Sequence, residues 1–292
     1  MIDEDRPDEV VVAKLGSPLA IGIGKDEYFI ASDASPFIEY TKRTIYLDDN
    51  EMAVISREQG FKMYSITSDK AITPIIQDIQ LSLETIEKGG FDYFMLKEIH
   101  EQPRAIIDTF RGRLLVDEQR INISGIEQNI EIFKNASRVT IIACGTSWHA
   151  GLVAEYLFED AARIPVEVEY ASEFRYRNPV INKGDIVIAI SQSGETADTL
   201  AAIKLAKENG AFVYGICNVV GSSIARASNA GTYTHAGPEI GVASTKAFTT
   251  QLTVIIMMGL RLGQLKGTID KAAFDRVAKQ LLAICLLYTS PS

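Results

Sequence analysis

The sequence predicts an α/β fold: a doubly wound parallel sheet in a three-layer sandwich, preceded by an antiparallel α+β segment. Two observations support this prediction. After residue 138, apolar runs typical of buried strands alternate with segments of helical periodicity, which indicates parallel strands joined by crossover helices. Before residue 70, the apolar runs are short and no helical segment separates them, which favours antiparallel pairing.

The first 70 residues contain several candidate strands. Apolar and aromatic residues at 19–21 and 28–30 are typical of strands. Two further runs, 44–47 and 52–55, are separated by the acidic and amide residues 48–50, which predicts a β-hairpin.

From Pro74 to about Gly112 the pattern is more helical. Breaks are expected at Gly89-Gly90 and at Pro103, and the apolar residues at helical spacing are Leu81, Leu83, Ile86, Phe94, Met95 and Ile99. A helical connector between two domains and a short helical subdomain both fit this pattern, and we prefer the connector.

Strands and helices alternate from residue 138 onward. Strands are expected at 139–143, 166–170, 186–190 and 212–216, and helices at 149–162, 197–210 and 244–266. The last helix is apolar nearly all round, so it is expected to be buried.

Two of these strands end in similar polar turns. The strand at 139–143 runs into Cys144-Gly145-Thr146-Ser147, and the strand at 186–190 runs into Ser191-Gln192-Ser193-Gly194-Glu195-Thr196. Ligands of open parallel sheets bind beyond the carboxyl ends of the strands, where free N–H groups at helix starts attract anions. Glycine lets the backbone approach a ligand, and hydroxyls add short donors. The turns therefore predict a cup for the phosphate monoester of a polyol.

A third stretch, residues 237–246, is expected to form another wall of the cup through its backbone and Ser244. The simpler alternative is that the Ser and Thr residues of all three segments are only helix N-caps. No Walker or G-x-G-x-x-G pattern follows a strand, so no nucleotide cofactor is expected. The three histidines and Trp148 are expected to have structural roles.

Composition narrows the possible partners. A net charge of −9 and a pI near 5.0 argue against nucleic-acid binding. The longest apolar run, 252–260, is far shorter than the ~20 residues of a membrane span, and the start lacks an apolar signal segment. A cytoplasmic location without membrane contact is therefore expected. The three cysteines have no metal-ligand spacing, so neither a metal site nor a disulfide is expected.

Three motifs in order resemble the first sugar isomerase (SIS) domain of the glutamine–fructose-6-phosphate aminotransferases (isomerising), the glucosamine-6-phosphate synthases. They are Cys-Gly-Thr-Ser at 144–147, Ser-Gln-Ser-Gly-Glu-Thr-Ala-Asp-Thr-Leu at 191–200, and Glu-Ile-Gly-Val-Ala-Ser-Thr-Lys-Ala-Phe-Thr-Thr-Gln at 239–251. Residues 16–34 also resemble the end of the family's glutaminase domain, and 97–103 its interdomain connector. The resemblance implies four segments: an incomplete glutaminase (Ntn-type amidotransferase) remnant at 1–70, a helical connector at 71–125, the first SIS domain at 126–280, and a tail outside the family at 281–292.

The family's activity is the glutamine-dependent conversion of fructose 6-phosphate to glucosamine 6-phosphate, which feeds UDP-N-acetylglucosamine synthesis. The resemblance implies a cytoplasmic homodimer that needs no organic cofactor or metal. By match of motif, the phosphate would be held by Ser147, Ser191, Gln192, Ser193 and Thr196, and the sugar by Thr146, the backbone of Val242, and Ser244.

The family's catalytic groups have no counterpart in these residues. Its nucleophile is an amino-terminal Cys, and its isomerising Glu, Lys and partner-subunit His belong to a second SIS domain. We therefore expect no catalytic residue here and no activity from the 292 residues alone. A phosphosugar-binding SIS regulator and a stand-alone sugar-phosphate isomerase are the alternatives, but residues 1–137 lack the basic helix of a regulator.

Overall fold

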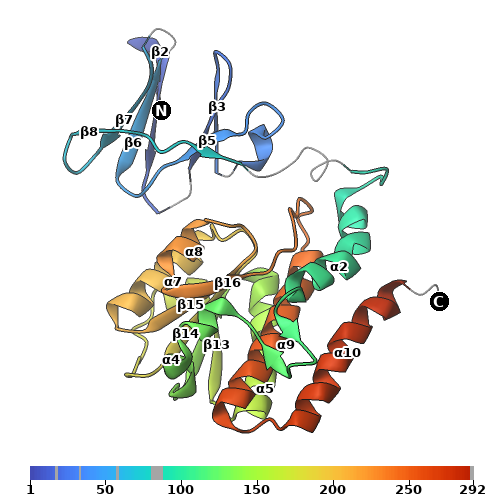
Figure 1. Cartoon of the computed structure of the whole chain (residues 1–292). Helices are drawn as coiled ribbons and strands as arrows, with labels where there is room; N and C mark the ends of the chain where they lie inside the picture. Colours follow the sequence, from blue (N-terminus) through green and yellow to red (C-terminus); the bar gives the residue numbers. More distant parts are fainter. Residues whose placement is uncertain (17–18, 33, 57–58, 80–87, 290–292) are drawn as a thin grey trace. The chain divides into compact units, whose positions relative to one another are not determined.

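The structure is a computed structural model that describes residues 1–16, 19–32, 34–56, 59–79 and 88–289 (Figure 1). The chain forms two compact units: an N-terminal unit, residues 1–87, and a C-terminal unit, residues 88–292. The family-based domain boundaries at 70, 125 and 280 remain predictions.

The N-terminal unit consists of two antiparallel sheets. The first has the order β1 (Ile2–Asp3), β2 (Arg6–Lys14), β6 (Glu51–Ser56), β7 (Gly60–Ser65) and β8 (Ala71–Ile72). The second has the order β4 (Tyr28–Ala31), β3 (Ala20–Ile23), β5 (Arg43–Tyr46) and β9 (Gln77–Asp78), with the short 3₁₀ helix η1 (Ser35–Phe37). Residues of both sheets share one apolar core, which includes Ile21, Ile45, Ala53 and Met63. The antiparallel prediction for this region is confirmed.

The hairpin predicted from 44–47 and 52–55 is wrong. β5 pairs with β3, whereas β6 pairs with β2 and β7, so residues 48–50 carry the chain from one sheet to the other. Leu47 and Ala53 nevertheless enter the same core, at 1% and 0% exposure. Two half-buried runs around a polar turn therefore fit two facing sheets as well as they fit a hairpin.

The C-terminal unit is built on a five-stranded parallel sheet. Its strands are β13 (Val166–Tyr170), β12 (Val139–Ala143), β14 (Ile186–Ser191), β15 (Phe212–Cys217) and β16 (Ala230–Tyr233), in that spatial order. Numbered along the chain the order is 2-1-3-4-5, which is a doubly wound arrangement whose direction reverses between β12 and β14. All four predicted strands of this sheet are confirmed.

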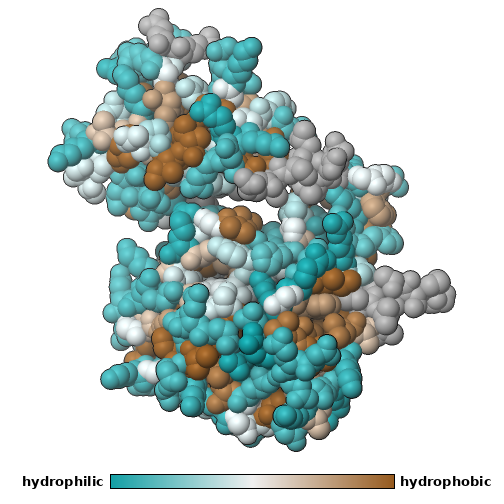
Figure 2. Space-filling view, viewed as in Figure 1, coloured by the Kyte–Doolittle hydropathy of each residue, from teal (hydrophilic) through white to brown (hydrophobic). Residues whose placement is uncertain are grey.

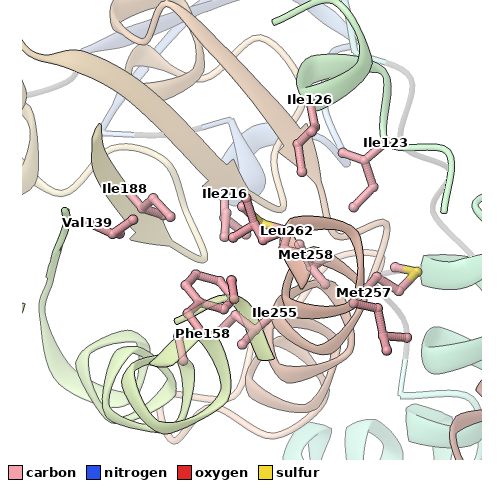
Figure 3. Packing of buried hydrophobic residues seen from close by; sticks show 14 of the residues in the cluster. Ile123, Ile126, Val139, Phe158, Ile188, Ile216, Ile255, Met257, Met258 and Leu262 are labelled. Atoms are coloured by element: carbon pink, nitrogen blue, oxygen red, sulfur yellow. The ribbon is translucent and has the colours of Figure 1, made fainter. Parts of the chain in front are cut away.

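Helices cover both faces of the sheet. One face carries α5 (Gly145–Ala162) and α9 (Lys246–Lys266), and the other carries α6 (Ala171–Phe174), α7 (Ala197–Glu208) and α8 (Ser223–Ala227). Side chains of β14 alternate between the two cores: Ile188 packs with Phe158 and Ile255 on the α5/α9 side (Figure 3), and Val187 packs with Ile203 on the other. The predicted three-layer sandwich is confirmed.

The remaining elements flank this sandwich. They are α2 (Phe94–Phe110), β10 (Leu114–Leu115), β11 (Arg120–Ile121), α3 (Ser124–Glu127), α4 (Ile130–Lys134) and α10 (Lys271–Thr289). α5 begins at Gly145 rather than at 149, and α9 begins at Lys246 rather than at 244. The expected helical residues Leu81, Leu83 and Ile86 lie outside the described residues, as do the last three residues of the tail predicted at 281–292.

Pro103 lies inside α2, although the sequence predicted a break there. Proline has no N–H for the carbonyl of Ile99, four residues earlier, which costs about 3 kcal/mol in a helix interior. The side-chain amide of Gln102 donates to that carbonyl instead, at 3.1 Å. The helix also packs against α9 and α10, with Ala105 and Ile106 buried. This tertiary burial outweighs the local cost.

The surface is mixed in polarity. On the face shown in Figure 2, hydrophilic residues cover most of each unit, and apolar residues occur in small separate groups. Among the described helices, none has both the length and the apolar character needed to cross a membrane.

Candidate functional site

A cavity of about 410 Å³ lies at the carboxyl end of the parallel sheet, where β12 and β14 are neighbours. This is the point at which the strand order reverses, and open α/β sheets bind ligands there. The volume is within the range of about 300–1,000 Å³ typical of small-molecule sites. All eight predicted binding residues line this one cavity: Thr146, Ser147, Ser191, Gln192, Ser193, Thr196, Val242 and Ser244.

The first wall is the turn from β12 into α5. Gly145 has a φ of +58°, a left-handed conformation that favours glycine, and it begins the helix directly after the strand. The N-cap position, Cys144, makes no side-chain capping bond, so the first N–H groups of α5 stay open to a ligand. Buried Gln251 of α9 donates from Nε2 to Ser147 Oγ at 3.0 Å. Because that bond uses the oxygen as an acceptor, the Ser147 proton is free to be donated elsewhere.

The second wall is the turn from β14 into α7. Ser191 Oγ and Thr196 Oγ1 are 3.0 Å apart, and Ser191 Oγ accepts from the N–H of Gly194 at 3.0 Å. Thr196 is the N-cap residue of α7, yet its side chain makes no capping hydrogen bond. The simpler N-cap interpretation of this threonine is therefore wrong. Its hydroxyl belongs to the cavity-lining turn.

Gly194 fixes the shape of the second wall. Its φ is +68°, and a Cβ at this position would stand 2.0 Å from Ser222 Oγ. Its carbonyl accepts from Ile224 N at 2.8 Å, and Glu195 Oε1 accepts from Ser223 N, also at 2.8 Å. The turn is thereby held against the start of α8.

The third wall is the loop before α9, and Glu239 organises it. Glu239 Oε1 accepts from the backbone N–H groups of Thr245 and Ala247, at 2.9 and 3.0 Å, and Oε2 accepts from Ser244 Oγ at 2.9 Å. The carboxylate thus caps α9, and neither Ser244 nor Thr245 does so. Sequence reasoning missed this residue. Glu239 lies seven residues before the first residue of α9, so no local capping pattern in the sequence indicates its role.

The electrostatic character of the cavity is asymmetric. Glu239 is the one acidic or basic side chain among the described residues that line it. The first two walls carry hydroxyls and the positive ends of α5 and α7. Asp198 in the first turn of α7 is paired with Arg175 at 2.7 Å, so its charge opposes an anion less. An anionic group is therefore favoured at the first two walls and disfavoured near Glu239.

Residues without a predicted ligand role have structural contacts. Trp148 stacks on Tyr170, with ring centroids 4.3 Å apart, and the Nδ1 of His149 lies 3.0 Å from the carbonyl of Gly145. His100 stacks on Phe91. Burial lowers the pKa of His235. These contacts agree with the structural roles expected from the sequence.

Burial raises the pKa of the Cys217 thiol to about 12, so this side chain is a poor nucleophile at neutral pH. Within the described part of the chain, no group of three or more His, Cys, Asp or Glu side chains could hold a metal ion.

The fold and the cavity define the class of protein. Residues 132–261 match the family model of the SIS domain, so the C-terminal unit contains an SIS domain. A solved structure with the same arrangement is the C-terminal domain of glucosamine-fructose-6-phosphate aminotransferase from Francisella tularensis. It has a TM-score of 0.64 and 40% sequence identity, over 69% of this chain and 56% of that one.

The sequence comparison is more particular. The chain is 54% identical, over 97% of its length, to the glutamine–fructose-6-phosphate aminotransferase [isomerizing] of Bacteroides thetaiotaomicron, and 56% identical, over 90%, to that of Chlorobaculum tepidum. It is therefore a homologue of the glutamine–fructose-6-phosphate aminotransferases, which confirms the resemblance seen in the motifs. The chain spans just under half of these relatives, 46% and 43% of their lengths.

Proposed function

We propose that this chain holds fructose 6-phosphate for its glutamine-dependent conversion to glucosamine 6-phosphate. The observation that carries the proposal is the arrangement of all eight predicted residues around one cavity at the strand-order reversal. The names of the relatives support the same substrate. Their alignment covers 97% of the chain, which includes most of the N-terminal unit, so a regulator or isomerase built on an SIS domain alone is less well supported.

The asymmetry of the cavity suggests how the substrate lies. The phosphate would accept hydrogen bonds from Ser147, Ser193 and Thr196 and from the open N–H groups of α5 and α7. The sugar would then extend toward the loop that contains Val242 and Ser244. Glu239 on that side disfavours the reverse orientation, because it would bring two negative charges together.

The wider activity is part of the same proposal. Residues 1–70 would be the end of a glutaminase domain that releases ammonia from glutamine, and residues 126–280 the first SIS domain. The whole protein would act as a cytoplasmic homodimer. We expect the cavity of this chain to bind the sugar phosphate.

Calorimetric titration of the purified chain tests the binding proposal. Fructose 6-phosphate should bind and fructose should not, because the phosphate supplies the charge that the two turns recognise. Equal binding of both sugars, or of neither, would contradict the proposal.

A further inference from the structure

The loop that forms the third wall, residues 237–245, is held by a second helix far away in the sequence. Glu98 of α2 is buried, at 2% exposure, and its Oε1 accepts from the backbone N–H groups of Ile240 and Gly241 at 2.6 and 3.0 Å. These two residues follow Glu239 directly. A carboxylate from α2 therefore grips the middle of a cavity wall that α2 does not itself line.

The fit between Glu98 and the loop is close. A Cβ on Gly241 would stand 2.6 Å from Glu98 Oε2, so only glycine lets the carboxylate reach the backbone. Gly241 has no left-handed φ in this structure. Glycine is therefore required here because it leaves room for the Glu98 carboxylate, and not because of its backbone conformation. Oε2 itself is buried without a hydrogen-bond partner among the described residues.

Burying a carboxylate is costly unless its hydrogen bonds repay the loss of water. One turn further along α2, Glu101 forms ion pairs that join α2 to the start of α9. Lys246 Nζ is 2.6 Å from Glu101 Oε2, and Lys97 Nζ is 3.6 Å from Glu101 Oε1. Lys246 is 3% exposed. The loop is thus joined to α2 at Glu98, and the first turn of α9 is joined to α2 at Glu101.

The two carboxylates divide the loop between them. Glu98 takes the N–H groups of residues 240 and 241, and Glu239 takes those of 245 and 247. Between them, the N–H groups of Val242, Ala243 and Ser244 make no hydrogen bond within the described residues. These three residues line the cavity. The segment left open to a ligand is the one that the carboxylates bracket.

We propose that Glu98 is a positioning residue for the sugar end of the site. Through its bonds to Ile240 and Gly241 it holds the loop that contacts the sugar in position, and it does not affect the two turns that bind the phosphate. The inference rests on the proposed function, since it assigns the sugar to the third wall. It predicts that loss of Glu98 separates recognition of the sugar from recognition of the phosphate.

Two ligands test this separation on the full chain. In Glu98→Ala, fructose 6-phosphate should bind about tenfold more weakly by calorimetry. The apparent affinity for inorganic phosphate, measured from the rise in melting temperature that phosphate causes, should change by less than about twofold. Glu98→Gln keeps an acceptor for both N–H groups and should bind fructose 6-phosphate like the parent. Asp108→Ala is the matched control, because Asp108 lies on the same helix and forms its ion pairs with Arg104 and Arg111, at the far end of α2 from Glu98.

Gly241→Ala is the second variant, should Glu98→Ala not fold. This variant leaves α2 intact and adds one methyl group where Oε2 lies. It should therefore weaken the binding of fructose 6-phosphate and leave the binding of inorganic phosphate unchanged, as in Glu98→Ala. Parent-like binding of fructose 6-phosphate in either variant would overturn the proposal. So would an equal loss of both ligands, which would mark a general structural role.

Amide hydrogen exchange without ligand makes the test independent of the proposed function. In Glu98→Ala, the N–H groups of Ile240 and Gly241 should exchange at least about tenfold faster, while that of Gly194 should keep its rate. Unchanged exchange at 240 and 241 would overturn the positioning role even if the parent binds no sugar phosphate. A parent that binds neither ligand, with faster exchange in the variant, would contradict the proposed function alone.

Discussion

The two ends of the parallel sheet use their polar groups in opposite ways. At the amino end, Asp185 precedes β14 and is 5% exposed; it accepts from the guanidinium of Arg138 and the N–H of Asn182, each at 2.8 Å, and from the hydroxyl of Ser137 at 3.2 Å. At the carboxyl end, the same strand runs into hydroxyls and helix starts that face a cavity. At the amino end the carboxylate bonds to its neighbours in the fold, whereas at the carboxyl end the hydroxyls that make internal hydrogen bonds also line the cavity.

This difference indicates which residues contribute to the stability of the fold and which contribute to ligand binding. Polar groups that bond to one another hold the sheet together, and a ligand has nothing to gain from them. Polar groups that face a cavity contribute less to the fold and more to recognition. Substitutions at the carboxyl end should therefore change ligand affinity, and substitutions at the amino end should change unfolding.

Gly194→Ala should have the largest effect and should change both properties. A left-handed φ costs a residue with Cβ about 1–2 kcal/mol, and the new methyl group would overlap Ser222 Oγ, 2.0 Å away. We expect a loss of about 2–4 kcal/mol in the free energy of unfolding and at least about a hundredfold loss of fructose 6-phosphate affinity. Urea denaturation and calorimetry measure the two.

Gly145→Ala is its matched control. Its φ is also left-handed, but no atom lies within 4 Å of the new Cβ. We expect only the conformational cost of about 1–2 kcal/mol. If both alanine variants lost the same free energy of unfolding, the overlap with Ser222 would not contribute to the destabilisation of Gly194→Ala.

Ser193→Ala and Thr196→Ala should affect binding alone. Each removes a hydroxyl that the proposed phosphate would use, and a hydrogen bond to a charged group is worth about 1.5–3 kcal/mol. Fructose 6-phosphate should therefore bind roughly tenfold to a hundredfold more weakly, with open backbone N–H groups retaining some affinity. Unfolding should change by less than about 1 kcal/mol, since Thr196 makes no capping bond and the bonds of both hydroxyls, to Ser191 Oγ and from the N–H of Glu195, stay within the turn. Calorimetry that finds parent-like affinity in both variants would reject the phosphate assignment.

Asp185→Asn should affect stability alone, and only above acidic pH. Burial by itself would raise the pKa of Asp185, but hydrogen bonds from Asn182 and from the Arg138 and Ser137 side chains hold it below its usual range. A lowered folded pKa means that the stabilisation is fully present above the unfolded pKa of about 3.9 and is lost as the pH falls through the folded value.

We therefore expect the variant to lose about 2 kcal/mol at pH 7 and progressively less below about pH 4. Denaturation of parent and variant at both pH values measures this difference. The affinity for fructose 6-phosphate at pH 7 should stay unchanged. A loss of stability that is equal at both pH values would show that the charge of Asp185 is not what stabilises the fold.

Arg163→Gly should give the smallest effect, and a gain. Arg163 ends α5 in the left-handed region, with φ +54° and ψ +36°, and precedes β13 at the amino end of the sheet. Glycine removes the Cβ strain but loses more backbone entropy on folding, so a net gain of about 0.5–1 kcal/mol is expected. A thermal melt should rise by a few degrees without any change in binding. A lower melting temperature would mean that the exposed Arg163 side chain stabilises the fold.

Local patterns were enough for four of the five strands of the parallel sheet and for the three segments that line the cavity. Each of the two turns follows a buried strand and precedes a helix, and this sequence of elements fixes where the turn lies in the sheet. The adjacency of β12 and β14 then brings Ser147 and Ser193 to the same cavity.

Features that depend on distant contacts were missed. The strands at 44–47 and 52–55 share a core without pairing, and only the partners β3 and β2 decide their sheets. α2 continues through Pro103 because of its packing and the Gln102 side chain. Glu98 reaches Ile240 across 142 residues of chain. The periodicity of the sequence does not predict such a long-range contact.

The stack of Trp148 on Tyr170 has a practical consequence. Trp148 is the single tryptophan of the chain, and it lies in the first turn of α5 beside Ser147. Its fluorescence therefore reports on the C-terminal unit alone, whereas far-ultraviolet circular dichroism records the backbone of both units. Following both signals through one denaturation curve would separate the unfolding of the SIS domain from that of the antiparallel sheets, without any label. The same emission would register a sugar phosphate that settles against the start of α5.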